Sequence, residues 1–124
     1  MGGSFVYICM ATTTGELGAR CEERAADFLR CCGYRVLERN YRTKTGEIDI
    51  VARDRDTIVF VEVRARASPS FGGAAETVGP VKRRKLIKTA LAYVSARRLD
   101  CPLRFDVIAV EAGRLEHICD AFQT

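Results

Sequence analysis

Histidine and closely spaced cysteine pairs are scarce in this sequence. His117 is the only histidine, and no cysteine is followed by another one three residues later. Zinc sites are typically built from such pairs together with histidines, so we do not expect zinc, and His117 is interpreted as structural. The cysteines are interpreted as reduced thiols of a cytoplasmic protein; they are Cys9, Cys21, Cys31, Cys32, Cys101 and Cys119.

Long apolar runs and a secretory signal are also lacking. The apolar stretch from Phe5 to Ala11 has no basic flank and is too short to span a bilayer, so we expect no membrane anchor. Three alternatives stay open for residues 1–12: an extra strand, a disordered tail, or sequence upstream of a start at Met10. We assign them as a tail outside the core, followed by a single domain over residues 13–124.

Charge is mildly positive in sum and uneven along the chain. The 124 residues are 48% apolar and carry a formal charge of +4, which fits one compact domain. Acidic residues concentrate before Glu62, whereas a cationic run lies at Lys82, Arg83, Arg84, Lys85 and Lys88. The run predicts contact with an anionic polymer, nucleic acid, and the alternative is an ordinary solvated helix face.

The hydrophobic pattern predicts the element order αβββαββ. A capping box at Thr13–Glu16 starts the first helix, which ends near Cys32 before Gly33. Strands follow over residues 34–42 and in a hairpin over 46–66. Gly79–Pro80 starts a second helix with a buried stripe, and two strands follow over 103–110 and 115–122. The expected stripe consists of Leu86, Ile87, Ala90, Leu91 and Val94. This order indicates an α/β (α+β) fold, a mixed central sheet flanked by helices.

The hairpin carries charged residues within its apolar strands. Side chains alternate along a strand, so Glu47 and Asp49 share one face of the first arm, and Glu62 and Arg64 share one face of the second. If Asp49 lies opposite Glu62, the turn closes with Asp54 opposite Thr57, and Glu47 falls opposite Arg64. Clustered carboxylates repel one another, so this register predicts a site for a divalent cation, Mg²⁺ or Mn²⁺.

Glu22 is a candidate fourth carboxylate. It lies at the edge of the apolar stripe of the first helix, where a carboxylate needs a partner. The alternative is an ion pair with Arg20 or Arg24.

Several short motifs, in this order, resemble the YraN family, also called UPF0102. They cover roughly Gly15 to Val110 and are Gly18 with Glu22-x-x-Ala25, Gly33-Tyr34, Arg39-Asn40-Tyr41-Arg42, Gly46-Glu47-Ile48-Asp49, Phe60-Val61-Glu62-Val63-Arg64, Phe71-Gly72-Gly73, the Lys82 to Lys85 run and Arg104-Phe105-Asp106. The resemblance implies a restriction-endonuclease-like fold of the PD-(D/E)xK type, similar to archaeal Holliday-junction resolvases.

The resemblance also implies roles for individual residues. Asp49 and Glu62 match the two acids that bind metal, with the Val63 carbonyl as a further ligand. Glu22 matches a glutamate that resolvase-like members add to the site. The role of Glu47 stays open between a ligand and a partner of Arg64.

Arg64 departs from the general motif, which has lysine at this position. Arginine stays protonated and can only orient water or stabilise phosphate charge, so a metal ion would have to generate the nucleophile. The leading hypothesis is a Mg²⁺-dependent endonuclease that cuts DNA, including branched or recombination intermediates, and a homodimer would match the two-fold symmetry of a junction. The alternatives are an inactive nucleic-acid-binding module of the same fold and a protein-interaction domain with structural ion pairs.

Overall fold

A computed structural model describes residues 4–8, 17–66, 78–111 and 114–123. The expected capping box at Thr13–Glu16 lies outside these ranges. The elements are β1 (Ser4–Ile8), α1 (Leu17–Cys31), β2 (Arg35–Thr43), β3 (Gly46–Asp54), β4 (Thr57–Arg66), α2 (Pro80–Ala96), β5 (Leu103–Glu111) and β6 (Arg114–Phe122). From α1 onward this order is the predicted αβββαββ.

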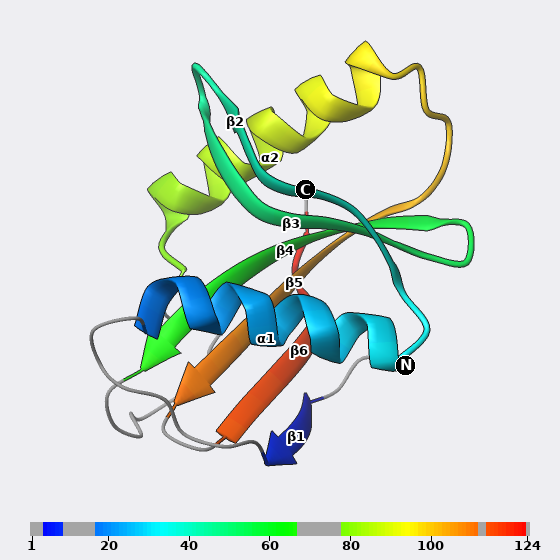
Figure 1. The fold of residues 1–124 in the computed structure, drawn as a ribbon. Coiled ribbons are helices and arrows are strands. Elements are labelled where there is room, and N and C mark those ends of the chain that lie inside the picture. The colour runs from blue at the N-terminus through cyan, green and yellow to red at the C-terminus, as the bar shows by residue number, and fades with distance from the viewer. Residues whose placement is uncertain (1–3, 9–16, 67–77, 112–113, 124) are drawn as a thin grey trace.

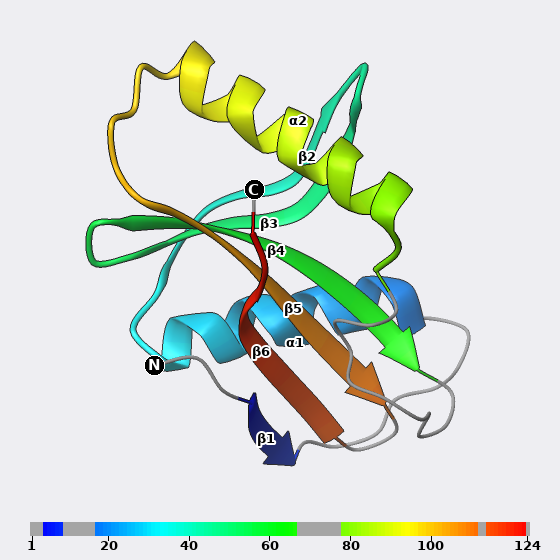
Figure 2. The ribbon, with the colours of Figure 1, turned by 180° about the vertical axis from the view of Figure 1, so that it is seen from behind.

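The strands form one mixed sheet in the order β1-β6-β5-β4-β3-β2. Only β4 and β5 are parallel, because α2 forms the crossover between them, and the other neighbouring strands are antiparallel. The two helices lie on opposite sides of the sheet (Figures 1 and 2). The predicted fold class, an α+β domain consistent with the restriction-endonuclease-like arrangement, is confirmed.

The segment Ser4–Ile8 forms the edge strand β1. It pairs antiparallel with β6, from Ser4 opposite Ile118 to Ile8 opposite Arg114. Of the three alternatives for residues 1–12, the structure therefore has an extra strand over residues 4–8.

Each face of the sheet has its own apolar core. Beneath α1, the side chains of Ile50, Val59, Val61 and Ile108 pack against Leu29. The second core lies beneath α2 and contains Ile48, Val51, Ile58, Phe60, Phe105 and Val107 together with the helix residues Leu86, Ala90 and Tyr93. Burying both sheet faces in this way accounts for the nearly continuous apolar character of β3, β4 and β5.

The buried face of α2 differs from the predicted stripe. Leu86 and Ala90 are buried as expected, but Thr89 and Tyr93 complete the buried face, and Leu91 is 49% exposed. A hydrophobicity pattern misses Thr89 because its buried hydroxyl is polar, yet this hydroxyl donates to the Lys85 carbonyl and is 2.9 Å from the Thr45 hydroxyl. This polar contact joins α2 to the tip of the β2–β3 hairpin.

The tip of this hairpin lies directly on α2. A Cβ atom added to Gly46 would be 3.2 Å from the Thr89 hydroxyl oxygen and 3.7 Å from the Lys85 Cβ. Glycine therefore permits the close approach that brings the start of β3, including Glu47, beside the first half of the helix.

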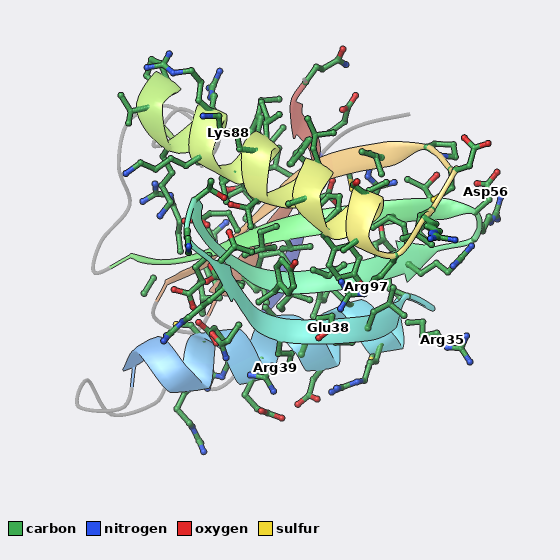
Figure 3. All side chains as sticks on the ribbon, turned by 90° about the horizontal axis from the view of Figure 1, so that it is seen from above. Arg35, Glu38, Arg39, Asp56, Lys88 and Arg97 are labelled. Atoms are coloured by element: carbon green, nitrogen blue, oxygen red, sulfur yellow. The ribbon has the colours of Figure 1, made fainter. Side chains whose placement is uncertain are left out.

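Strand β2 is joined to both helices through neighbouring side chains. The Glu38 carboxylate accepts from Arg97 after the end of α2 at 3.0 Å, and the next residue, Arg39, donates to Glu23 of α1 at 2.8 Å (Figure 3). Consecutive residues point to opposite faces of a strand, so this edge strand contacts each helix in turn.

No helix within the described ranges is both long and apolar enough to cross a membrane.

The end of α1 yields a prediction. Gly33 has a φ of 93° and donates to the Arg30 carbonyl, while Tyr34 donates to the Leu29 carbonyl. These bonds cap the last turn in the left-handed conformation that glycine tolerates, and a Cβ there would meet nothing within 4 Å. We expect Gly33→Ala to lower the free energy of unfolding by about 1 kcal/mol for conformational reasons alone.

Urea denaturation measures this loss. Gly33→Asn is the matched control, because asparagine enters the left-handed region more easily than alanine and should lose less stability. Equal stability of the alanine variant and the wild type would contradict the assignment of this cap.

Candidate active site

The β3–β4 hairpin divides at Asp49 and Glu62, and this point is called the fork below. The two strands pair from Asp54 opposite Thr57 to Ile50 opposite Val61, in the register predicted from the sequence, and the ladder ends one pair before Asp49 and Glu62. Beyond the fork β3 continues with β2, whereas β4 continues with β5 as far as Arg66. The two arms diverge visibly in Figure 1.

β3 changes the faces of its side chains at the fork. Ile48 and Ile50 are two residues apart and would share one face of a regular strand, yet Ile48 belongs to the α2 core and Ile50 to the α1 core. On β2, Asn40 lies between the pairs Arg39–Ile50 and Tyr41–Ile48 and has a φ of 54°. The irregular position on β2 therefore lies at the level of Asp49, where the hairpin bends toward α2.

At the fork, a carboxylate accepts a backbone hydrogen bond. The Val63 N–H donates to Oδ2 of Asp49 at 2.8 Å. This bond fixes the half-buried Asp49 side chain between the diverging strands, next to Glu62. The hydrogen bond takes the place of the backbone pairing that a continued ladder would form here.

Acidic side chains from three elements surround Asp49. Burial raises the pKa of Asp49 to about 7, the hydrogen bond from Val63 opposes this rise, and the charges of Glu62, Glu22 and Glu47 raise it further. Glu62, Glu22 and Glu47 thus lie close enough for their charges to act on Asp49. Burial is the main reason that Asp49 keeps its proton to near neutrality, and the neighbouring negative charges add to this effect.

Glu62 is nearly buried, with a side chain 7% exposed, and it has a cationic partner on α2. Nζ of Lys82 lies 2.7 Å from Oε2 of Glu62. Lys82 was predicted as a residue for nucleic-acid contact, so its ion pair with Glu62 is a feature that the sequence did not reveal.

The predicted pairing of Glu47 with Arg64 does not occur in the ladder. Glu47 lies beyond the fork, where β3 has separated from β4, and it is paired instead with Arg42 of β2. Nε of Arg42 is 3.3 Å from Oε2 of Glu47. The sequence pattern could not reveal this, because it carries no sign that the two strands part.

Glu22 and Arg64 occupy the positions expected of them. Glu22 is half-buried on α1, and among the described residues it has no ion pair with Arg20 or Arg24. Its charge instead acts on Asp49. Arg64 is half-buried on β4, two residues after Glu62 and so on the same face of the strand.

The basic run on α2 divides into two groups. Arg83 donates to the Val78 carbonyl at 2.8 Å and its guanidinium lies over the Phe122 ring, so it contributes to packing. Lys85 and Lys88 are exposed. Lys85, with Lys82 and Glu47, lines a groove of about 410 Å³ between the hairpin tip and α2, next to the carboxylates.

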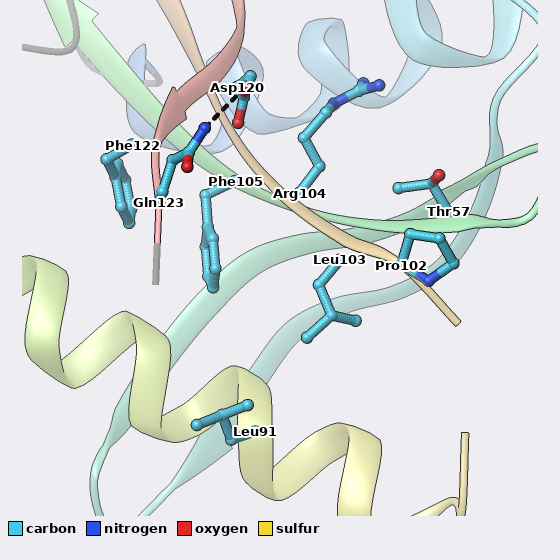
Figure 4. Close-up of a pocket in the computed structure, with 9 residues that line it drawn as sticks. All are labelled: Thr57, Leu91, Pro102, Leu103, Arg104, Phe105, Asp120, Phe122 and Gln123. Atoms are coloured by element: carbon cyan, nitrogen blue, oxygen red, sulfur yellow. Dashed lines mark hydrogen bonds between the residues drawn. The ribbon is translucent and has the colours of Figure 1, made fainter. Parts of the chain in front are cut away.

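A second hollow, of about 640 Å³, lies elsewhere. It opens between α2, β5 and the end of β6, with Leu91, Leu103, Phe105 and Phe122 on its walls (Figure 4). Asp120 is its only acidic lining residue and is hydrogen-bonded to Gln123. Although this hollow is larger than the groove beside the fork, its lining has no cluster of acidic side chains.

Another acidic group lies beneath α1, at Asp106. Ligand atoms of Asp106, His117 and Cys119 fall within 4.8 Å of one another, a spacing compatible with metal binding. However, Oδ1 of Asp106 accepts from Arg104 and from the Asp120 N–H, and Oδ2 accepts from Arg104 and lies 2.8 Å from Nε2 of His117. Both oxygens are thus fully engaged, and a permanent cation is already bound to them.

The lowered pKa of Asp106 agrees with a structural role for this carboxylate. Burial alone would raise the pKa of Asp106, but the hydrogen bonds from His117 and Arg104 lower it below its ordinary value. His117 is 4% exposed and lies edge-on to the Phe28 ring. We therefore assign this group as a buried ion network.

Comparison with known proteins identifies the family. The profile of the Uncharacterised protein family UPF0102 matches residues 21–110. A UPF0102 protein of Syntrophus aciditrophicus is 50% identical over 115 residues, covering 89% of this chain and 88% of the relative. One from Thermodesulfovibrio yellowstonii is 47% identical over 107 residues, 86% of this chain and 96% of the relative. The chain belongs to the UPF0102 family.

The fork carboxylates of this UPF0102 chain have the donor chemistry of a divalent-metal site, although the group of ligand atoms within 4.8 Å of one another among the described residues is that of Asp106, His117 and Cys119. The fork offers only oxygen donors, as Mg²⁺ and Mn²⁺ prefer, and a cation, the Lys82 ammonium, already lies on Glu62. Among the described contacts, Asp49 uses Oδ2 for Val63 and has no hydrogen bond to Oδ1. Asp49, Glu62 and Glu22 could therefore hold a metal ion, with Glu47 at the edge of the site.

Titration of Asp49 in the metal-free protein is a first test of the site. Its pKa of about 7, compared with about 3.9 when unfolded, means that the unfolded chain ionises first and that the folded state loses stability between about pH 4 and pH 7. Asp49→Asn removes this penalty and still accepts from Val63. We expect it to raise the free energy of unfolding at pH 8 by about 1–3 kcal/mol and to have almost no effect at pH 4.

Urea denaturation at both pH values measures the difference, and carboxyl NMR measures the titration itself. Asp56→Asn, at the exposed turn of the same hairpin, is the control and should be neutral at both values. An Asp49→Asn variant that is less stable than the wild type at pH 8 would contradict the raised pKa of Asp49.

Asp106 should respond in the opposite direction. Its lowered pKa stabilises the folded state above about pH 4, and this contribution is lost as the pH falls further. Asp106→Asn leaves Arg104 without its buried counter-charge, so we expect a loss of about 3 kcal/mol at pH 7 that shrinks toward pH 3. Denaturation across this range checks the trend, and a constant loss at every pH would argue against it.

Proposed function

We propose that this UPF0102 protein is a metal-dependent endonuclease that hydrolyses DNA phosphodiesters with Mg²⁺ or Mn²⁺. The observation that carries the proposal is that Glu62, Glu22 and Glu47 lie close enough to Asp49 for their charges to add to the effect of burial, which together raise the pKa of Asp49 to about 7. Asp49 has no ion pair among the described residues, whereas Asp106 is paired with Arg104.

The residues of the fork have distinct roles in this proposal. Asp49, Glu62 and Glu22 would hold the metal ion, with the Val63 carbonyl as a further ligand. When bound, the ion would supply an acidified water molecule and a contact to the phosphate. The Val63 N–H keeps the Asp49 carboxylate oriented. Arg64, always protonated, stabilises the charge that develops on the phosphate, and Glu47 screens Arg42 at the edge of the site.

Basic residues beside the fork provide the contact with the DNA backbone. Lys85 lines the groove that adjoins the carboxylates, and Lys88 follows one turn later on the exposed side of α2. Phosphate contacts of this kind give sequence-independent, salt-sensitive binding. Branched and recombination intermediates are the preferred substrates in this proposal, since the chain resembles resolvases, which act as two-fold dimers on junctions.

The experiment combines purified protein with Mg²⁺ or Mn²⁺ and a panel of linear, flapped and four-way DNA. We expect nicking or resolution of at least one substrate, and Asp49→Ala should reduce the rate more than about 100-fold, because even partners of metal ligands typically contribute 10–100-fold. Asp56→Ala is the matched control, since Asp56 lies at the other end of the same hairpin, and it should keep full activity.

Arg64 supports a second candidate function, an inactive nucleic-acid-binding module. Arginine cannot act as a base at neutral pH, and the only histidine, His117, is part of the Asp106 network beneath α1. Calorimetry separates the two functions. Salt-sensitive DNA binding without a Mg²⁺ or Mn²⁺ site, and without cleavage of any substrate, would favour the module.

A further inference from the structure

Lys82, a residue of the basic run, forms an ion pair at the fork. Its ammonium is 2.7 Å from Oε2 of Glu62, whose side chain is 7% exposed, while the Lys82 side chain is 50% exposed. The carboxylate is therefore held in place by β4, whereas the lysine approaches it from the solvent side. In this ion pair the Glu62 carboxylate is fixed, whereas the Lys82 ammonium has room to move away into solvent.

A divalent ion and this ammonium compete for the same carboxylate. Oxygen ligands lie about 2.0–2.2 Å from Mg²⁺, so a metal ion on Glu62 would place its two charges within a few ångströms of Nζ in the present geometry. At separations of about 4 Å, like charges repel by kilocalories per mole in a partly buried site. Occupation of Glu62 by the metal ion thus favours departure of the ammonium.

The position of Lys82 on α2 allows this departure without movement of the backbone. It lies in the first turn of a helix that begins at Pro80 and is anchored by buried Leu86, Thr89 and Ala90. The side chain is long and half-exposed, and it borders the groove that also contains Lys85 and Val81. Rotation of the lysine side chain can carry its ammonium from Glu62 to the groove.

From these contacts we infer that Lys82 is an exchangeable counter-ion: it neutralises Glu62 in the metal-free protein, is displaced by the metal ion, and then binds a phosphate group of the substrate. This inference rests on the proposed function. Lysine suits both positions because it is a compact point charge on a flexible stem. The consequence is a coupling in which metal binding and phosphate binding strengthen each other.

Metal affinity without any substrate is the first test. Calorimetry with Mn²⁺ should show that Lys82→Met binds the ion about tenfold more tightly than the wild type, a gain of about 1.4 kcal/mol, because the competitor is gone. Lys82→Arg keeps the charge and should remain within about threefold of the wild type. Arg98→Met removes an exposed cation just after the same helix, to which no role is assigned; it is the control for general charge removal and should also remain close to the wild type.

DNA affinity with and without metal is the second test. We use Ca²⁺, which also prefers oxygen ligands, and a four-way DNA at fixed ionic strength. The ion should tighten DNA binding by the wild type, and Lys82→Met should lose most of this tightening despite its stronger metal binding. A lysine with a purely structural role would not change metal affinity and metal-dependent DNA affinity in opposite directions.

The outcomes separate this inference from the proposed function. If Asp49→Ala abolishes Mn²⁺ binding but Lys82→Met binds no more tightly than the wild type, the exchange is wrong and the metal site stands. If neither the wild type nor Lys82→Met binds Mn²⁺, both proposals fail. Tighter Mn²⁺ binding with unchanged coupling to DNA would overturn the phosphate-binding step. Circular dichroism verifies that each variant is folded, and Lys82→Gln replaces Lys82→Met if the latter is not.

Discussion

The hydrogen bond from the Val63 N–H to the Asp49 carboxylate is the interaction on which the site depends. It stands where the β3–β4 ladder would otherwise continue, and it allows β3 to turn with β2 toward α2 while β4 stays with β5. The division of the hairpin has two results. It opens space for side chains in the middle of the sheet, and it keeps the acid at that place ordered.

The negative charges around the fork are only partly neutralised by basic side chains. Lys82 partly neutralises Glu62, and Arg42 partly neutralises Glu47, but Asp49 is left with a raised pKa beside three other acids. Such an arrangement costs stability in the metal-free protein, and it persists because the two cores on either face of the sheet hold the strands in place. Natural proteins commonly accept such a cost at functional sites.

The two buried acidic centres of this UPF0102 chain differ in the direction of their pKa shifts. Asp106 accepts hydrogen bonds from Arg104 and His117, and its pKa is lowered. Burial and, after it, the charges of neighbouring carboxylates raise the pKa of Asp49. The first is a closed network that stabilises the junction of β5 and β6 beneath α1. At the second centre, Asp49 has no ion pair among the described residues, and the functional proposal therefore concerns the fork, although the group with the spacing of metal ligands is that of Asp106.

The sequence by itself determined the element order from α1 onward, the mixed sheet, the Gly33 cap and the register that closes with Asp54 opposite Thr57, because these follow from local periodicity and turn chemistry. The sequence also singled out Asp49, Glu62, Glu22 and Glu47. Only the tertiary structure decided that β3 leaves β4 at Asp49, that Glu47 pairs with Arg42, and that Lys82 reaches Glu62. Those outcomes depend on how α2 packs across the hairpin tip through Thr89 and Gly46, a contact between segments more than forty residues apart that no local pattern encodes.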